Sequence, residues 1–203
     1  MSRLILVRHG FTKSNSAERY WGQTDVELSA DGLKQAERLR DRLATEKIDA
    51  IYSSNLKRAV VTAQTIASVH KLEVVVCPEI GEMNFGKLEG LTFVEISKLY
   101  SEVTRMWKER NPALKCPGGE SAREFNLRVA QFDERLKKHT PEETILIVAH
   151  SGSLRALMCH FMKIGMERRW QFRLDFASIT SLETFPEGAI LTGLNENCHP
   201  GGL

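Results

Sequence analysis

The stretch that decides the fold is Arg3–Thr12, RLILVRHGFT. Its aliphatic run Leu4–Val7 has no polar residue on either face, which is typical of a strand buried inside an α/β sheet. The run ends in Arg8 and His9, and then in Gly10, whose missing Cβ lets the backbone approach a ligand closely. Such residues at the end of a buried strand indicate a binding site for an anion.

Strand patterns alternate with helical patterns along the rest of the chain. Strands are predicted at Leu4–Val7, Asp49–Tyr52, Glu73–Val76 and Thr144–Ala149, and a terminal pair at Ile179–Phe185 and Ala189–Leu194. This alternation predicts an α/β fold of three layers, with a mostly parallel, twisted sheet covered by helices on both faces. Ligands bind at the carboxyl ends of the strands in such sheets. We therefore expect His9 and His150, which each follow an aliphatic strand, at the same edge.

Polar residues mark where the helices start. Ser29 can cap a helix that runs to about Glu46, and Ser53-Ser54-Asn55 opens another. Thr92 and Ser121 each stand three residues before a glutamate, the spacing of a capping box. A further helix is expected from near Ser153. Other segments are expected to be irregular: the proline- and glycine-rich stretch 111–119 is predicted to be loop, and residues 195–203 a loose tail.

Composition narrows the classes of protein. The chain has 203 residues, of which 42% are hydrophobic and 27% charged, so we expect one domain, 1–203. The net charge of +2 favours neither a nucleic-acid nor a membrane-surface partner, and no apolar run approaches the length of a membrane span. The four cysteines are widely spaced and form no metal-ligand pattern, which favours a reducing cytoplasm.

The predicted edge has the residues that phosphate chemistry needs. Histidine and arginine side chains beside helix N-termini form a receptor for a phosphate group. His9 could attack phosphorus only with an unprotonated ring nitrogen. Neighbouring cationic side chains disfavour a second positive charge, so they should keep His9 neutral near physiological pH.

Together these motifs resemble the histidine phosphatase superfamily, also called the phosphoglycerate-mutase-like family. The resemblance spans almost the whole chain and rests on six blocks in the family's order. They are Arg8-His9-Gly10 with Thr12 and Asn15, Gly22 to Gly32, Ser53 to Ala59, Glu82 to Gly90, and the pair Pro117–Ser121 and Val148–Gly152.

The resemblance implies a role for each matching residue. His9 would be the nucleophile that becomes phosphorylated, while Arg8, Arg58 and His150 would stabilise charge on the transferring phosphoryl group. Asn15 would add a hydrogen bond to the phosphoryl oxygens. Further substrate contacts are expected from Ser151, Trp21 and Gly22, and no metal or organic cofactor is implied.

Glu82 would protonate the leaving oxygen and then activate water to hydrolyse the phosphohistidine. Such an acid must hold its proton near neutral pH, which burial and a dianionic phosphate favour. Glu79 and Glu89 lie in the same glycine-rich segment and could compete for the role. Phe11 and Trp21 depart from the residue types usual in the family, and an apolar rim at these positions would favour a leaving group with a ring.

The family contains phosphatases and mutases. Mutases are generally longer, with segments that guard the phosphohistidine from water, so the chain is expected to be a metal-independent phosphomonoesterase acting on a small-molecule phosphate monoester. A lid or insert is expected at about 92–120. Within the phosphatases, the chain resembles the α-ribazole-5′-phosphate phosphatases of cobalamin synthesis. Alternatives are a broad-specificity phosphatase, a phosphoglycerate mutase or a non-catalytic module that binds phosphorylated ligands, and the protein could be a monomer or a homodimer.

Overall fold

A six-stranded sheet forms the centre of the computed structural model, which describes residues 2–14 and 19–197. The strand order is β3-β2-β4-β1-β5-β6. The strands are β1 Ser2–Arg8, β2 Ala50–Ser53, β3 Val74–Val76, β4 Thr144–Ala149, β5 Ser178–Phe185 and β6 Gly188–Asn197. Strands β1 to β4 are parallel, whereas β5 pairs antiparallel with both β1 and β6. The mostly parallel sheet is thus confirmed, with an antiparallel pair at one edge.

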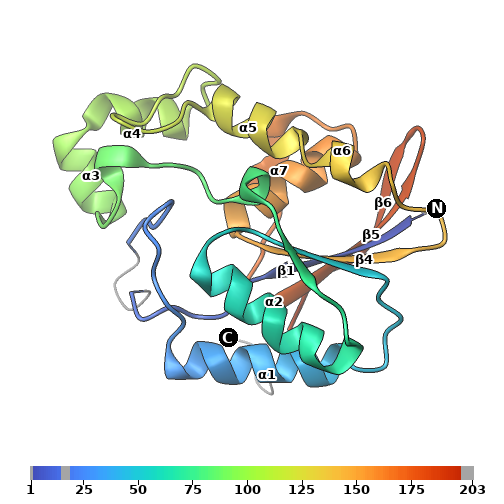
Figure 1. Cartoon of the computed structure of the whole chain (residues 1–203). Coiled ribbons are helices and arrows are strands. Elements are labelled where there is room, and N and C mark those ends of the chain that lie inside the picture. Colours follow the sequence, from blue (N-terminus) through green and yellow to red (C-terminus); the bar gives the residue numbers. More distant parts are fainter. Residues whose placement is uncertain (1, 15–18, 198–203) are drawn as a thin grey trace.

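Helices cover both faces of this sheet (Figure 1). The α-helices are α1 Ala30–Leu43, α2 Lys57–His70, α3 Phe93–Leu99, α4 Ser101–Lys108, α5 Ala122–Ala130, α6 Asp133–Leu136 and α7 Ser151–Phe161. Short 3₁₀ helices are η2 Pro78–Ile80, η3 Gly86–Leu88 and η4 Met166–Gln171. Helices α1 and α2 lie on one face, and α5, α6 and α7 lie on the other, which gives the three predicted layers (Figure 1).

The aliphatic run in β1 is explained by burial on both faces. Ile5 and Val7 pack in the core cluster that contains side chains of α1 and α2. Leu4 and Leu6 point the other way, into the cluster with α5 and α7. Successive side chains of a strand alternate between its faces, so a strand covered on both sides is apolar at every position.

The helix caps expected at Ser29, Thr92 and Ser121 are confirmed. The Ser29 side chain accepts a hydrogen bond from the backbone N–H of Gly32, and the capping boxes of Thr92 with Glu95 and of Ser121 with Glu124 are both formed. Each cap satisfies backbone donors that the first helical turn leaves without partners.

Some expected boundaries are wrong by a few residues. Helix α1 ends at Leu43 instead of near Glu46, and α7 begins at Ser151 instead of near Ser153. The loose tail expected from Asn195 is wrong for residues 195–197, because β6 continues through Asn197, which pairs with Ser178. The polar, glycine-rich composition of this segment suggested a tail, but its pairing with β5 keeps these residues in the strand. The remaining tail residues lie outside the described part of the chain.

The pairing of β1 with β4 positions the two motif histidines. Arg8 lies opposite Ala149 in this parallel pair, and the backbone N–H of His9 donates to the carbonyl oxygen of Ala149 at 3.1 Å. His9 and His150 therefore leave neighbouring strands at the same carboxyl edge. The prediction that they share one edge is confirmed.

Helices α3 and α4 lie at the end of the molecule toward which β1 runs (Figure 1). They belong to the segment 92–120, where we expect a lid, and that role stays a prediction. Stretch 111–119 is irregular as expected, apart from an isolated bridge between Lys115 and Ser121. None of the helices in the described ranges combines the length and the apolar character needed to cross a bilayer.

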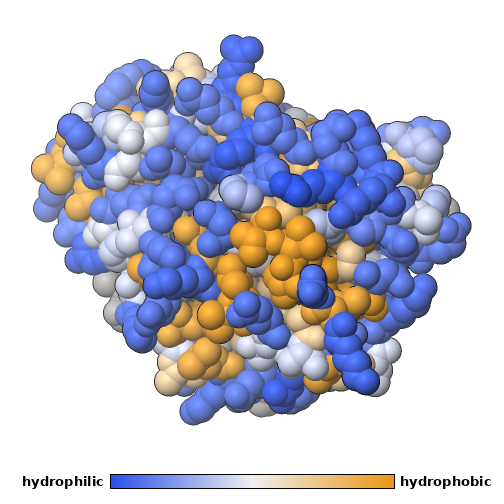
Figure 2. All heavy atoms as spheres, in the orientation of Figure 1, coloured by the Kyte–Doolittle hydropathy of each residue, from blue (hydrophilic) through white to orange (hydrophobic). Residues whose placement is uncertain are grey.

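Figure 2 shows apolar residues gathered near the middle of the face on which Figure 1 draws β3. Val75 and Val76 of this edge strand have exposed side chains. In the sheet, β2 separates this strand from β4, and β2 and β4 separate it from β1.

Gly32 fixes the turn that follows β1 against the start of α1. A Cβ at Gly32 would lie 2.0 Å from the carbonyl oxygen of Phe11, which is backbone and cannot move alone. We predict that Gly32→Ala lowers the free energy of unfolding by about 2 kcal/mol, the usual scale of overpacking. Urea denaturation measures this change, with Lys34→Ala on the exposed face of α1 as the matched control. Equal stability of the two variants would show that the contact at Gly32 is loose.

Candidate active site

A cavity of about 360 Å³ opens at the carboxyl edge of β1 and β4. Its wall contains most of the residues that the motifs singled out: Arg8, His9, Trp21, Arg58, Glu82, His150 and Ser151. Gly22 lies outside the wall, and Asn15 lies outside the described residues. The fold thus brings together side chains that are more than one hundred residues apart in the sequence.

His9 is buried at the end of β1, and its tautomer is set by its own backbone. Nδ1 lies 2.8 Å from the carbonyl oxygen of Gly10, which can only accept, so Nδ1 carries the proton of the neutral ring. Nε2 is then the unprotonated nitrogen. Burial, together with the charges of Arg58 and Arg8, holds the pKa of His9 well below its ordinary value. The expected neutral state is confirmed, although burial contributes more to it than the cations do.

Arg8 lies in the wall but is oriented by the protein itself. Its Nη1 donates to the carbonyl oxygen of Leu174 at 2.7 Å, and its guanidinium lies 3.5 Å from the centre of the Phe176 ring. That ring also contacts His9, with 5.5 Å between the ring centres. Burial lowers the pKa of Arg8 to about 10, so the guanidinium stays charged at neutral pH. Its Nε is buried and has no hydrogen-bond partner among the described residues.

Arg58 comes from the first turn of α2 and is almost fully buried. Its Nη2 donates to the carbonyl oxygen of Gly22 at 2.7 Å, and its Nη1 to that of Thr24 at 3.0 Å. Gly22 therefore lies behind Arg58 and holds it in place. Burial lowers the pKa of Arg58, and Glu82 and Asp25 oppose this shift.

His150 is held between two side chains. Its Nδ1 accepts a hydrogen bond from Nε of Arg58 at 3.3 Å, and its Nε2 lies 2.7 Å from the hydroxyl oxygen of Ser54. Burial and the charge of Arg58 keep its pKa well below the ordinary value. The ring centres of His9 and His150 are 5.0 Å apart, so the cavity holds two neutral imidazoles beside two buried guanidinium groups.

Glu82 is fixed by backbone donors. Oε1 accepts from the N–H of Met83 at 2.8 Å, and Oε2 accepts from the N–H of Gly152 at 2.9 Å. A Cβ at Gly152 would lie 2.2 Å from Oε1, so only glycine leaves room for the carboxylate there. Glu82 is also the only acidic residue among the described residues of the wall.

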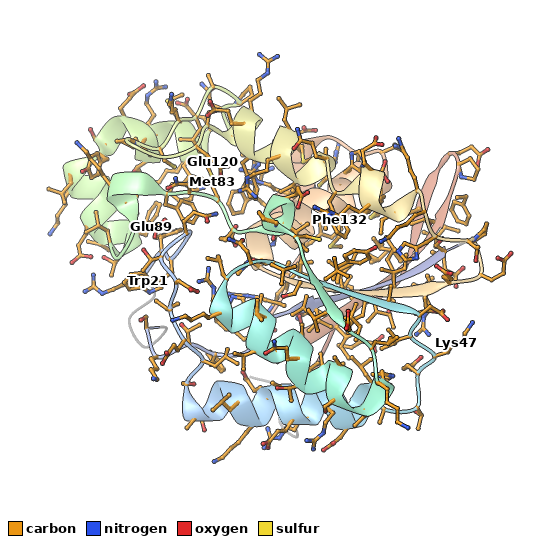
Figure 3. All side chains as sticks on the ribbon, in the orientation of Figure 1. Trp21, Lys47, Met83, Glu89, Glu120 and Phe132 are labelled. Atoms are coloured by element: carbon orange, nitrogen blue, oxygen red, sulfur yellow. The ribbon has the colours of Figure 1, made fainter. Side chains whose placement is uncertain are left out.

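The competing glutamates are engaged elsewhere. Glu79 pairs with Arg135 at 2.6 Å. Glu89 accepts hydrogen bonds from the backbone N–H groups of Gln23 and Thr24, and Figure 3 shows it near Trp21. Neither carboxylate lies in the cavity wall. The geometry therefore favours Glu82 over both for a role in the cavity.

Arg128 braces the segment that carries Glu82. Its guanidinium donates to four carbonyl groups of that segment, those of Pro78, Glu79, Gly81 and Glu82. It also forms a 2.7 Å ion pair with Glu120. Glu120 in turn accepts from the backbone N–H of Asn84, and Figure 3 shows it close to Met83. The glutamate of the Pro117–Ser121 block thus acts on the cavity through this brace.

The sequence analysis missed several residues of the wall. Arg155 lies one helical turn after Ser151 on α7, so its spacing of four from a motif residue was the available signal. Phe176 and Trp170 follow no motif, and only the fold brings them to the cavity. Trp21 lies in the wall as expected, whereas Phe11 does not and instead contacts Phe176, with ring centres 4.6 Å apart.

Among residues 2–14 and 19–197, no three His, Cys, Asp or Glu side chains are grouped as metal ligands. The charged groups that face the cavity are mainly cationic: Arg8, Arg19, Arg58 and Arg155, opposite the single carboxylate of Glu82. This balance suits a dianionic phosphate group.

The buried histidines make stability depend on pH. The pKa of His9 and of His150 is lower in the folded than in the unfolded chain, so the unfolded chain binds more protons as the pH falls below about 6.5. We predict that the free energy of unfolding decreases from pH 7.5 to 5, by up to about 1.4 kcal/mol per pH unit for each histidine. Urea titrations at several pH values measure it. His9→Gln should show a shallower decrease than the wild type, and an unchanged slope would contradict the prediction.

Comparison with known proteins agrees with this geometry. The family model of the histidine phosphatase superfamily (branch 1) matches residues 4–197. Phosphoserine phosphatase 1 of Hydrogenobacter thermophilus is 35% identical over 99% of this chain and 95% of its own length. The adenosylcobalamin/α-ribazole phosphatase of Escherichia coli is 32% identical over 95% of both chains. The crystal structure of the α-ribazole phosphatase from Shigella flexneri superposes with a TM-score of 0.88 at 31% identity, over 99% of each chain.

The matched range contains every described residue of the cavity, and similarity extends over nearly the full length of these relatives. The relatives differ in the substrates that their names give, so they agree on phosphate-ester hydrolysis and not on one ester. The chain belongs to branch 1 of the histidine phosphatase superfamily and is a phosphatase.

Proposed function

We propose that this chain is a metal-independent phosphomonoesterase that works through a phosphohistidine at His9. The observation that carries the proposal is the bond from His9 to the Gly10 carbonyl, which leaves Nε2 unprotonated in a cavity lined by arginines. Nε2 attacks phosphorus, and the bond from phosphorus to the ester oxygen breaks. Glu82 gives a proton to that oxygen, then takes one from the water that hydrolyses the phosphohistidine, which restores both residues.

The other motif residues stabilise the transferring group. Three of the five N–H donors of Arg58 bond the protein, which leaves two for phosphoryl oxygens. Arg8, Ser151 and Asn15 supply further contacts.

The substrate that the cavity suits best has a ring in its leaving group. Tyr20, Trp21, Phe85, Trp107 and Trp170 form much of the wall beyond the histidines. Flat rings pack well against such side chains. α-Ribazole 5′-phosphate is therefore the first candidate, supported by the substrate names of the E. coli and Shigella relatives.

Phosphoserine is the second candidate. The Hydrogenobacter relative carries that substrate in its name, and Arg19 or Arg155 in the wall could pair with the carboxylate of phosphoserine. Its ammonium group would need an acidic partner, and the described wall has only Glu82. The aromatic wall therefore favours a ring-bearing ester, and broad specificity is the remaining alternative among the phosphatases.

A cytoplasmic location is part of the proposal. Cys77, Cys116 and Cys159 are unpaired and buried, as in a protein from a reducing compartment. Burial raises the pKa of Cys116 to about 12 and that of Cys77 to about 11, so these thiols stay protonated. For the oligomeric state, both a monomer and a homodimer remain predictions.

Substrate profiling tests the assignment. We expect phosphate release to be faster from α-ribazole 5′-phosphate than from phosphoserine, phosphoglycerate or p-nitrophenyl phosphate, with no loss in the presence of a chelator. His9→Ala should abolish turnover of every ester. A preference for phosphoserine would move the assignment to the second candidate, and a flat profile to a broad-specificity phosphatase. Transfer between the 2- and 3-positions of phosphoglycerate that exceeds phosphate release would indicate a mutase, and turnover by His9→Ala would exclude the phosphohistidine mechanism.

Gly152→Ala tests the acid role of Glu82. The added Cβ displaces the carboxylate, so we expect kcat for an alkyl ester to fall about 100-fold, with a smaller fall for p-nitrophenyl phosphate, whose leaving group needs no proton. Glu82→Gln should show the same pattern. Gly165→Ala is the matched control, because its Cβ meets only the flexible side chain of Glu167. Equal losses for both ester types would contradict the role.

A further inference from the structure

A second cavity, of about 340 Å³, adjoins the first. The two cavities share Trp107, at the end of α4, and Trp170, in η4. These two side chains form the boundary between the cavities, and both offer ring surface to each. A molecule bound at His9 therefore needs to pass only these rings to reach the second cavity.

The second cavity is basic on one side and apolar on the other. Arg110, Arg123 and Arg169 lie in its wall, and so do apolar residues, including Leu114 and Met166. Its one carboxylate, Glu167, is exposed and lies 4.0 Å from Arg168, which points outside the cavity wall. Three guanidinium groups thus face a cavity that provides no well-placed counter-charge.

Two of these arginines have unused donors. Within the described part of the chain, the guanidinium groups of Arg123 and Arg169 make no hydrogen bond and no ion pair. Arg169 is partly buried and lies 4.9 Å over the ring of Trp170. Asn126, from α5, adds a side-chain oxygen that is buried and lacks a partner among the described residues. Arg123 is exposed, so the groups whose missing contacts a ligand would supply are Arg169, which suits an anion, and the Asn126 oxygen, which accepts from a donor group.

The two cavities are also connected electrostatically. Trp170 has Arg155, from the first cavity, 5.9 Å from its ring centre, in addition to Arg169 from the second. The charge of Glu82 acts on Arg169 as well as on Arg155. Arginines of both cavities thus meet at the ring of Trp170, an arrangement that fits one substrate extending from the first cavity into the second.

We infer that the second cavity is a subsite for an anionic group at the far end of the leaving group. The phosphoryl group lies at His9, the ring of the leaving group packs against Trp107 and Trp170, and a second anionic substituent binds Arg123 and Arg169. This inference rests on the proposed phosphohistidine mechanism and extends its substrate class beyond α-ribazole 5′-phosphate, whose leaving group is neutral, to ring-bearing esters with a second anion. Sulfonate, carboxylate and phosphate all satisfy that chemistry.

A matched pair of esters tests the subsite. 2-Naphthyl phosphate and its 6-sulfonate derivative share the ring and the scissile ester, and only the second carries the additional, non-hydrolysable anion. We expect kcat/KM of the wild type to be about tenfold higher for the sulfonate, mainly through KM. Arg169→Gln and Arg123→Gln should bring this ratio close to one. Both esters are measured on the same preparation of each variant. A misfolded fraction therefore lowers both values of kcat/KM equally and does not change their ratio.

Arg168→Gln is the matched control, since Arg168 neighbours Arg169 in η4 but lies outside the wall, and it should keep the wild-type ratio. A wild-type ratio near one, or a ratio that Arg169→Gln and Arg123→Gln leave unchanged, would overturn the subsite. So would free 2-naphthalenesulfonate acting on 2-naphthyl phosphate turnover without competing with it, because that identifies a separate effector site. Loss of all turnover in His9→Ala reports on the proposed mechanism independently of the ratio.

Discussion

The parallel pairing of β1 with β4 is the constraint on which the cavity depends. Its register sets Arg8 opposite Ala149, so the next residue on each strand is a histidine at the same edge. The side chains of both strands are buried on both faces, which fixes this register, because a slip by one residue would exchange the faces of the whole strand. Arg58 then joins His150 to the loop before α1 by bonding His150 and the carbonyl groups of Gly22 and Thr24.

The partners of Arg8 and Arg58 explain why the positive charge of both side chains remains available to an anion. Arg58 and Arg8 meet carbonyl oxygens, which hold a guanidinium without neutralising its charge. The nearby imidazoles respond by remaining neutral. The site therefore retains positive charge beside an unprotonated ring nitrogen of His9, a combination that suits a phosphate dianion.

Much of this arrangement could be predicted from the sequence. Aliphatic strands that end in His9 and His150, and the caps at Ser29, Thr92 and Ser121, are local patterns, and local patterns determine elements and their order. The rule that parallel strands end at the same edge of a sheet then predicted that His9 and His150 lie together. Phe176 and Trp170 could not be predicted, because they reach the cavity through the packing of segments that carry no motif. The end of β6 was misjudged because pairing with Ser178, and not composition, decides it.

The way Glu82 is held has a consequence for how this protein can change over evolution. Its carboxylate is positioned by the backbone N–H groups of Met83 and Gly152, and its segment by the Arg128 brace, and none of these contacts involves a tryptophan of the wall. Substitutions at Trp21, Trp107 or Trp170 can therefore reshape the leaving-group side without moving the acid. Under the proposed mechanism, one wall can thus change to admit a new leaving group while the residues that carry the reaction stay in place.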